Sequence, residues 1–103
     1  MAVMHANEGN FKEMVAGDLV LVDFFATWCG PCKMLGPVLE ELDTDRSGIN
    51  IVKVDIDESR ALAQQYGVMS VPTLFLMKNG QVVSQKSGFM PKEMLTSWIE
   101  ESK

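Results

Sequence analysis

Residues 19–32 have the sequence LVLVDFFATWCGPC, in which an apolar run leads into a pair of cysteines. Residues 19–26 have the length of a β-strand, and their side chains do not alternate between polar and apolar, which is typical of a strand covered on both faces. Cys29 and Cys32 are the only two cysteines of the chain. Two thiols three residues apart at a strand-to-helix junction indicate a redox-active pair in a domain of the α/β class.

The spacing of the two cysteines places one of them outside the helix that follows. In a regular helix the Cβ atoms of residues i and i+3 lie about 5–6 Å apart, whereas a disulfide requires roughly 3.5–4.5 Å. Proline favours the first helical position, so Pro31 predicts a helix with Cys29 as its exposed N-terminal cap. The Cys29 sulfur then faces unpaired backbone N–H groups, including that of Cys32, and the positive end of the helix dipole, which lower the pKa of a thiol. We therefore predict that Cys29 is the nucleophile and that the more buried Cys32 resolves a mixed disulfide.

Two other roles of the cysteine pair, a stabilising cross-link and a structural zinc site, are less favourable. A cross-link that closes so short a loop contributes only about 2 kcal/mol in the chain-entropy model. A structural zinc site needs four ligands, and His5 is the only histidine of the chain. We therefore predict no metal site.

Asp23 is the only charged residue inside the apolar run. An isolated carboxylate is costly to bury, so such a group either raises its pKa or finds a partner. From the residues alone two interpretations stay open. Asp23 is either a strand-end aspartate that reaches water or pairs with a lysine such as Lys53, or a functional acid.

The remaining pattern predicts a three-layer α/β/α sandwich, in which four helices flank a central mixed sheet of four to five strands. Strands are expected over residues 2–4, 19–26, 51–55, 73–77 and 82–85. Helices are expected over residues 8–16, 31–43, about 57–65 and from Pro91 onward. The βαβ spacing predicts that residues 19–26 and 51–55 are parallel, while Asn79-Gly80 predicts an antiparallel hairpin with a type I′ turn.

Length and charge restrict the class of protein. The chain has 103 residues, enough for one domain over residues 1–103, and a net charge of −5, which argues against nucleic acid as a partner. No run approaches transmembrane length, and residues 1–5 lack the features of a secretory signal. We expect a cytoplasmic monomer without a membrane partner, and we expect its eight methionines to be mostly core packing.

The segment DFFATWCGPCK, residues 23–33, resembles the active-site segment of the thioredoxin family. Val71-Pro72-Thr73, Lys78-Asn79-Gly80 and Gly88 follow in the order and approximate spacing of that family. The resemblance extends from about Phe11 to Trp98, and it implies the thioredoxin fold.

The resemblance also implies an activity. It implies a general protein-disulfide reductase with a redox-active Cys29–Cys32 disulfide, which carries electrons to client proteins and binds no cofactor. Its reducing equivalents would come from NADPH through the flavoprotein thioredoxin reductase. The implied clients include ribonucleotide reductase, peroxiredoxin and methionine sulfoxide reductase.

Roles for further residues come from the same resemblance. Asp23 is implied to be a buried acid–base group that assists deprotonation of Cys32, with Lys53 beside it. Pro72 is implied to be cis and to pack against the cysteines, which would leave the backbone of Val71 free to pair with an extended client segment. The implied active-site loop and client groove consist of Trp28, Gly30, Pro31, Val71, Pro72, Thr73 and Gly88.

The chain departs from the family in two places. Phe25 stands where many thioredoxins have a second tryptophan, and Ser87 and Phe89 flank Gly88 where smaller or aliphatic residues are usual. Phe89 would enlarge the apolar patch at the groove rim, unless it points inward to the core. Two alternative functions remain to be tested: an oxidant or isomerase of the same fold, and an adaptor whose thiols are incidental.

Overall fold

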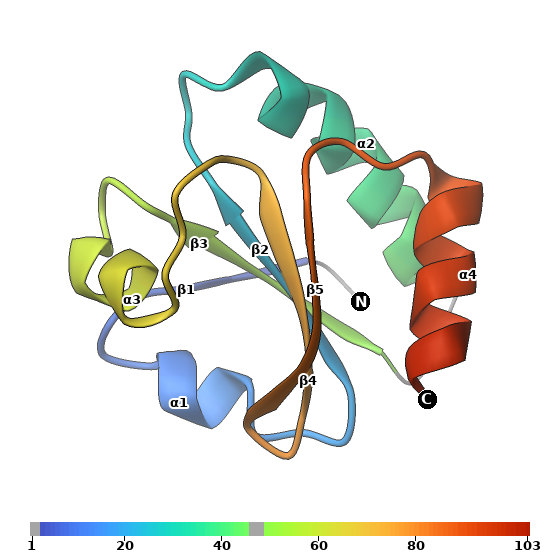
Figure 1. Cartoon of the computed structure of the whole chain (residues 1–103), viewed down its shortest axis with the longest axis horizontal. Coiled ribbons are helices and arrows are strands. Elements are labelled where there is room, and N and C mark those ends of the chain that lie inside the picture. The colour runs from blue at the N-terminus through green and yellow to red at the C-terminus, as the bar shows by residue number, and fades with distance from the viewer. Residues whose placement is uncertain (1–2, 46–48) are drawn as a thin grey trace.

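A five-stranded mixed sheet lies between two layers of helices (Figure 1). The structure, a computed structural model, describes residues 3–45 and 49–103. In chain order the elements are β1 (Met4–Ala6), α1 (Phe11–Met14), β2 (Val20–Phe25), α2 (Gly30–Asp45), β3 (Asn50–Asp55), α3 (Arg60–Gln65), β4 (Thr73–Lys78), β5 (Gln81–Ser87) and α4 (Lys92–Ser102). The strand order is β1-β3-β2-β4-β5, with β1, β3 and β2 parallel and β4 and β5 antiparallel to their neighbours. The predicted three-layer sandwich is confirmed, with five strands.

Strand β2 occupies the centre of the sheet and is buried on both faces, as its apolar run without alternation predicts. Successive side chains of a strand point to opposite faces. Leu21 packs in one cluster with Leu35 of α2, and Phe24 packs in the other cluster with Phe11 of α1. Asp23 therefore projects from the same face as Leu21, beneath the layer that contains α2 and α4.

Helix α2 begins directly after Cys29, one residue earlier than predicted, and continues through Pro37. Leu35, Leu39 and Leu42 recur at helical spacing and are fully buried against the sheet. This packing fixes the helix over the sheet, so its N-terminus stays at the carboxyl end of β2.

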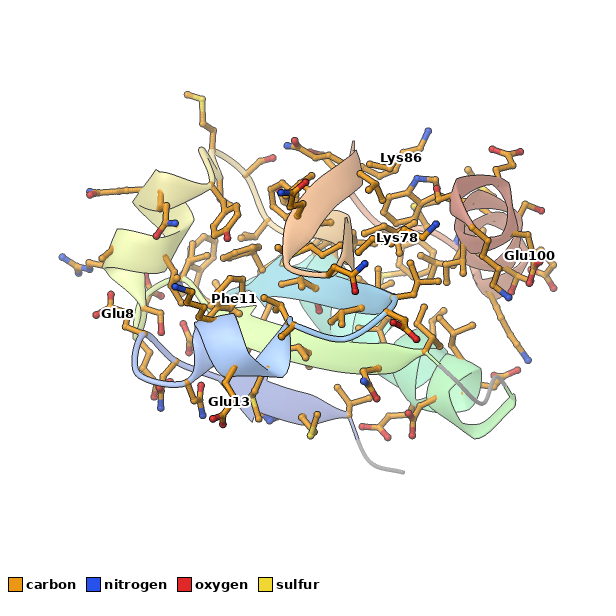
Figure 2. The ribbon with its side chains drawn as sticks, turned by 90° about the horizontal axis from the view of Figure 1, so that it is seen from below. Glu8, Phe11, Glu13, Lys78, Lys86 and Glu100 are labelled. Atoms are coloured by element: carbon orange, nitrogen blue, oxygen red, sulfur yellow. A yellow bond between two sulfur atoms is a disulfide. The ribbon has the colours of Figure 1, made fainter. Side chains whose placement is uncertain are left out.

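Helix α1 covers only residues 11–14, whereas the sequence predicted a helix over residues 8–16. The side chains of Asn7 and Asn10 account for the difference. Asn7 Oδ1 accepts hydrogen bonds from the backbone N–H groups of Gly9 at 2.8 Å and Asn10 at 3.1 Å, and Asn10 Oδ1 accepts one from the N–H of Asn7. Such local bonds hold a turn in place of the first helical turn. In Figure 2 Phe11 lies between α1 and the sheet and Glu13 on the outer side of α1, while Glu8 lies beside α3, where its Oε2 accepts a hydrogen bond from the N–H of Ala61.

The predicted edge strand is also displaced. It was expected over residues 2–4, but β1 covers Met4–Ala6 and pairs in parallel with β3. Residue 2 lies outside the described part of the chain.

The hairpin between β4 and β5 is confirmed. Asn79 has a φ of 51° and Gly80 a φ of 82°, the positive values that a type I′ turn requires at both central residues. This turn lies at the opposite end of the hairpin from Thr73, which pairs with Ser87.

The prediction that the methionines are mostly core packing is wrong for three of them. Met77 and Met90 are buried, but Met34, Met69 and Met94 are exposed. Met34 precedes the buried Leu35, and Met94 precedes the buried Leu95. The apolar stripes of α2 and α4 are therefore narrower than predicted: Leu35, Leu39 and Leu42 form the first, and Leu95, Trp98 and Ile99 form the second.

Candidate active site

The cysteine pair lies where β2 ends and α2 begins, and the two residues form a disulfide. The backbone N–H of Cys32 donates to the Sγ of Cys29 over 3.2 Å, as predicted. The Cys29 sulfur therefore lies at the positive end of the dipole of a 16-residue helix. Both effects favour a negative charge on this sulfur, so the site can support a reactive thiolate at position 29 when the disulfide is reduced.

Cys29 is not the exposed residue that the sequence predicted. Only 5% of its surface is accessible, against 4% for Cys32, so the two cysteines are buried almost equally. The Sγ of Cys29 lies 3.6 Å from the carbonyl oxygen of Val71, and the pair packs with Ala26, Val71 and Ile56. The loop before β4 thus covers a sulfur that local geometry alone would leave in solvent.

This loop is held by contacts of its own residues. The Val71–Pro72 peptide bond is cis, as the family resemblance implied. The hydroxyl of Thr73 donates to the carbonyl of Ser70 over 2.6 Å, and the N–H of Gly88 donates to the carbonyl of Pro72 over 2.9 Å. The structure therefore brings residues 71–73 and Gly88 together beside Cys29.

Gly88 has a φ of 92°, in the left-handed region that side chains rarely adopt. This conformation lets the chain leave β5 with its N–H directed to Pro72. Phe89 follows and has 39% of its surface accessible, so it lies at the surface rather than in the core.

Trp28 is exposed, and its indole N–H donates to Oδ2 of Asp57 over 2.8 Å. Asp57 stands at the start of the helix predicted over about residues 57–65, and its contact with the active-site loop was not predicted. The available signal was topological: Asp57 lies just beyond β3, and Trp28 lies just beyond the parallel strand β2. The carboxyl ends of parallel strands meet at one edge of a sheet, so the two residues are neighbours there.

Exposed residues occur on two segments that adjoin the cysteine pair. Gly30 and Pro31, in the first turn of α2, are exposed, and Met69, two residues before Val71, has 96% of its surface accessible. Apolar side chains are therefore exposed both in the first turn of α2 and in the loop that precedes β4.

Asp23 is completely inaccessible to solvent, so the interpretation in which it reaches water is wrong. Within residues 3–45 and 49–103, neither carboxyl oxygen has a hydrogen-bond partner. Burial raises the pKa of Asp23 to about 7, although the positive charge of Lys53 opposes the increase. A carboxyl with this pKa can both accept and donate a proton near neutral pH.

Lys53 lies beside Asp23 in the sheet but makes no hydrogen bond with it in the described structure. The two residues are register partners on β3 and β2. The Nζ of Lys53 lies over the ring of Phe25, 4.4 Å from its centroid. Lys53 therefore acts on Asp23 through its charge at a distance.

Residues 3–45 and 49–103 contain no group of three or more His, Cys, Asp or Glu side chains that could hold a metal ion. The helices of the same part of the chain include none that is long and apolar enough to cross a membrane.

The chain is similar to known proteins over nearly its whole length. The sequence model of the family described as Thioredoxin matches residues 2–101. Thioredoxin from Bacillus subtilis is 48% identical over 100 residues, covering 96% of each chain, and thioredoxin from Staphylococcus saprophyticus is 48% identical over 101 residues, covering 97% of each. Among solved structures, a mutant thioredoxin from Halobacterium salinarum superimposes with a TM-score of 0.89 at 38% identity, covering 96% of this chain and 88% of that one. The chain therefore belongs to the thioredoxin family and is a thiol–disulfide oxidoreductase that reduces protein disulfides.

Proposed function

We propose that Cys29 is the nucleophile and Cys32 the resolving residue of this reductase. The Cys29 thiolate attacks one sulfur of a client disulfide, forms a mixed disulfide and releases the other client sulfur as a thiolate. Cys32 then loses its proton and attacks the Sγ of Cys29, which releases the second client thiolate. The client gains two electrons, and Cys29–Cys32 becomes the disulfide.

The hydrogen bond from the N–H of Cys32 to the Cys29 sulfur is the observation on which this assignment rests. It gives one sulfur of the pair a donor at the start of α2, and a thiolate there is stabilised relative to the thiol. The sulfur of Cys32 lies one turn further into the helix, where it is suited to the second attack.

Asp23 is proposed as the acid–base group of the second step, with Lys53 as its charged neighbour. Because the pKa of Asp23 is raised to about 7, its carboxylate can take the proton of Cys32 at neutral pH. Asp23 projects beneath α2, the helix that carries Cys32, so the acid lies on the side of the sheet where the proton is released.

The client is proposed to bind across the loops beside Cys29. The backbone of Val71 is the proposed pairing site for an extended client segment, which would add as a strand. The exposed indole of Trp28 supplies apolar surface next to it. The remaining contact residues of the proposed groove are Gly30, Pro31, Pro72, Thr73 and Gly88.

The source of electrons and the clients are proposed from the family. A flavoprotein thioredoxin reductase would reduce Cys29–Cys32 with electrons from NADPH, without a cofactor bound to this chain. Clients would include ribonucleotide reductase, peroxiredoxin and methionine sulfoxide reductase. The protein is further proposed to be a cytoplasmic monomer of one domain without a membrane partner, and its net charge of −5 argues against a nucleic-acid partner.

The experiment that tests this assignment is covalent trapping. Cys32→Ser should accumulate mixed disulfides with client proteins through Cys29, because the second step is removed. Cys29→Ser is the matched control and should trap none. A double Cys→Ser variant that retains full activity would indicate an adaptor, and equal trapping by both single variants would overturn the assigned order of attack.

A further inference from the structure

Phe25 contacts two side chains that can carry positive charge. The Lys53 ammonium lies 4.4 Å from the centroid of the Phe25 ring, and the His5 imidazole packs edge-on against the ring with 6.1 Å between the centroids. His5 and Lys53 are register partners on β1 and β3, and Lys53 is the register partner of Asp23 on β2. Register partners on neighbouring strands share one face of the sheet, so the three polar side chains form a row across it.

The Lys53 ammonium can reach either of two groups, the Asp23 carboxyl or the Phe25 ring. Neighbouring strands lie about 4.8 Å apart, so its long side chain can bring the ammonium to the Asp23 carboxyl. The ammonium lies instead over the aromatic ring, where the electron-rich face attracts a cation. Both Asp23 oxygens are without a hydrogen-bond partner in the described structure.

We infer that Phe25 is a positioning residue for the exchange reaction: its ring holds the Lys53 ammonium and so keeps it from pairing with the Asp23 carboxyl. The inference rests on the proposed acid–base role of Asp23. A carboxylate paired with an ammonium is a weaker base, because the pair stabilises the charged form. By holding the cation aside, Phe25 leaves Asp23 able to take a proton from Cys32 near neutral pH.

Lys53 is the cation that influences the pKa of Asp23, as the groups around the carboxyl show. From β3 it faces Lys53, and from β4 its register partner is the uncharged Leu74. The buried face of α2 above it contributes Leu35 and Leu39, together with Cys32, which titrates only when the disulfide is reduced. Beyond Lys53, the next residue in the row is His5 on β1, in contact with the Phe25 ring.

The test is an NMR titration of the Asp23 carboxyl carbon in the oxidised protein, with no client present. Phe25→Leu keeps an apolar side chain and removes the aromatic face, so Lys53 is free to approach Asp23. We expect the pKa of Asp23 to fall by about one pH unit, the lower end of the effect of an opposite charge within 4–6 Å. Phe25→Trp keeps an aromatic face and should leave the pKa at its native value. Phe25→Met, which also lacks an aromatic face, gives the same test independently of the folding of the Leu variant.

The same titration in a protein that lacks the Lys53 ammonium shows whether Phe25 acts through Lys53. In Lys53→Met, Phe25→Leu should no longer lower the pKa of Asp23. An equal decrease in this background, or no decrease in the native one, overturns the inference.

The acid–base role of Asp23 and the positioning role of Phe25 can be disproved independently of each other. If Asp23→Asn resolves mixed disulfides at the native rate, the acid–base role of Asp23 is wrong, whatever the titration gives. If Asp23→Asn is slow but Phe25→Leu leaves the pKa of Asp23 unchanged, the acid–base role stands and the positioning role of Phe25 is wrong.

Discussion

The indole of Trp28 and the carboxylate of Asp57 are joined by a 2.8 Å hydrogen bond across the top of two parallel strands. The bond links the loop before Cys29 to the loop before α3. The backbone N–H of Asp57 is itself bound to Oδ1 of Asp55, at the end of β3. The exposed indole is therefore tied to the end of the sheet through a loop that is ordered by its own hydrogen bonds.

Asp57→Ala should reduce the efficiency of client reduction by releasing the indole. A hydrogen bond of this kind contributes on the order of 1 kcal/mol, so kcat/KM for a disulfide-bonded protein is expected to fall about fivefold. Asp57→Asn keeps an oxygen acceptor and should stay close to the native value. The motion of Trp28 can be followed by its fluorescence anisotropy in a Trp98→Phe background. Equal losses in the Ala and Asn variants would show that the charge of Asp57 matters and the hydrogen bond does not.

Asp23→Asn should stabilise the oxidised protein, and the gain should depend on pH. The pKa of Asp23 is about 7 in the folded protein against 3.8 as the ordinary value, so between these values the folded state binds the extra proton. The contribution of Asp23 to stability therefore falls as pH rises from about 4 to about 7, and is constant above. The gain in Asp23→Asn should be near zero at pH 4 and on the order of 4 kcal/mol above pH 7.

Denaturant unfolding of both proteins from pH 4 to pH 8 measures this difference. Asp18→Asn, which removes an exposed carboxylate near the start of β2, is the matched control. A gain that is the same at all pH values would mean that folding does not raise the pKa of Asp23.

The same substitution should slow the release of clients. At pH 7 the loss of the acid–base group should slow resolution of the mixed disulfide by about a hundredfold, the lower end of the usual range for general acid–base catalysis. In the native protein this rate should rise with pH through about 7, as the Asp23 carboxylate forms. The difference should shrink near pH 8.5 and above, where a thiol ionises in water without help. Stopped-flow measurement of a preformed mixed disulfide isolates this step, and slowing by the same factor at every pH would contradict the assigned role.

Local pattern predicted the elements that carry the cysteines. The apolar run of β2, the helical repeat of Leu35, Leu39 and Leu42, and the Asn79-Gly80 turn each specify their structure within a few residues. The hydrogen bond from Cys32 to the sulfur of Cys29 followed from the position of Pro31 alone. These features could be predicted because neighbours in sequence determine them.

The features that were missed depend on distant residues or on competing local bonds. The burial of Cys29 comes from the loop of Val71, 42 residues further along the chain. The contact between Trp28 and Asp57 spans 29 residues and needs the parallel pairing of two strands. The short α1 results from side-chain bonds of Asn7 and Asn10 that compete with the helix. The hydrophobic pattern of a short segment does not contain these distant contacts or competing side-chain bonds.

Phe89→Ala should weaken the binding of protein clients without changing the chemistry at the disulfide. The Phe89 side chain is 39% accessible and follows Gly88, whose N–H is bound to Pro72 beside the cysteine pair. A client that covers this ring gains on the order of 1 kcal/mol from the apolar surface removed from water, so KM should rise about fivefold. The rate with a small aromatic disulfide, which is too small to reach Phe89, should stay at the native value.

Val82→Ala is the matched control for Phe89→Ala, because Val82 is 42% accessible but pairs with Met77, next to the Asn79-Gly80 turn. The other end of the hairpin, where Thr73 pairs with Ser87, adjoins the cysteines. The control should leave KM for the protein client unchanged. A rise in KM of equal size in both variants, or equal slowing of the small disulfide by Phe89→Ala, would mean that Phe89 supports the fold and does not contact clients.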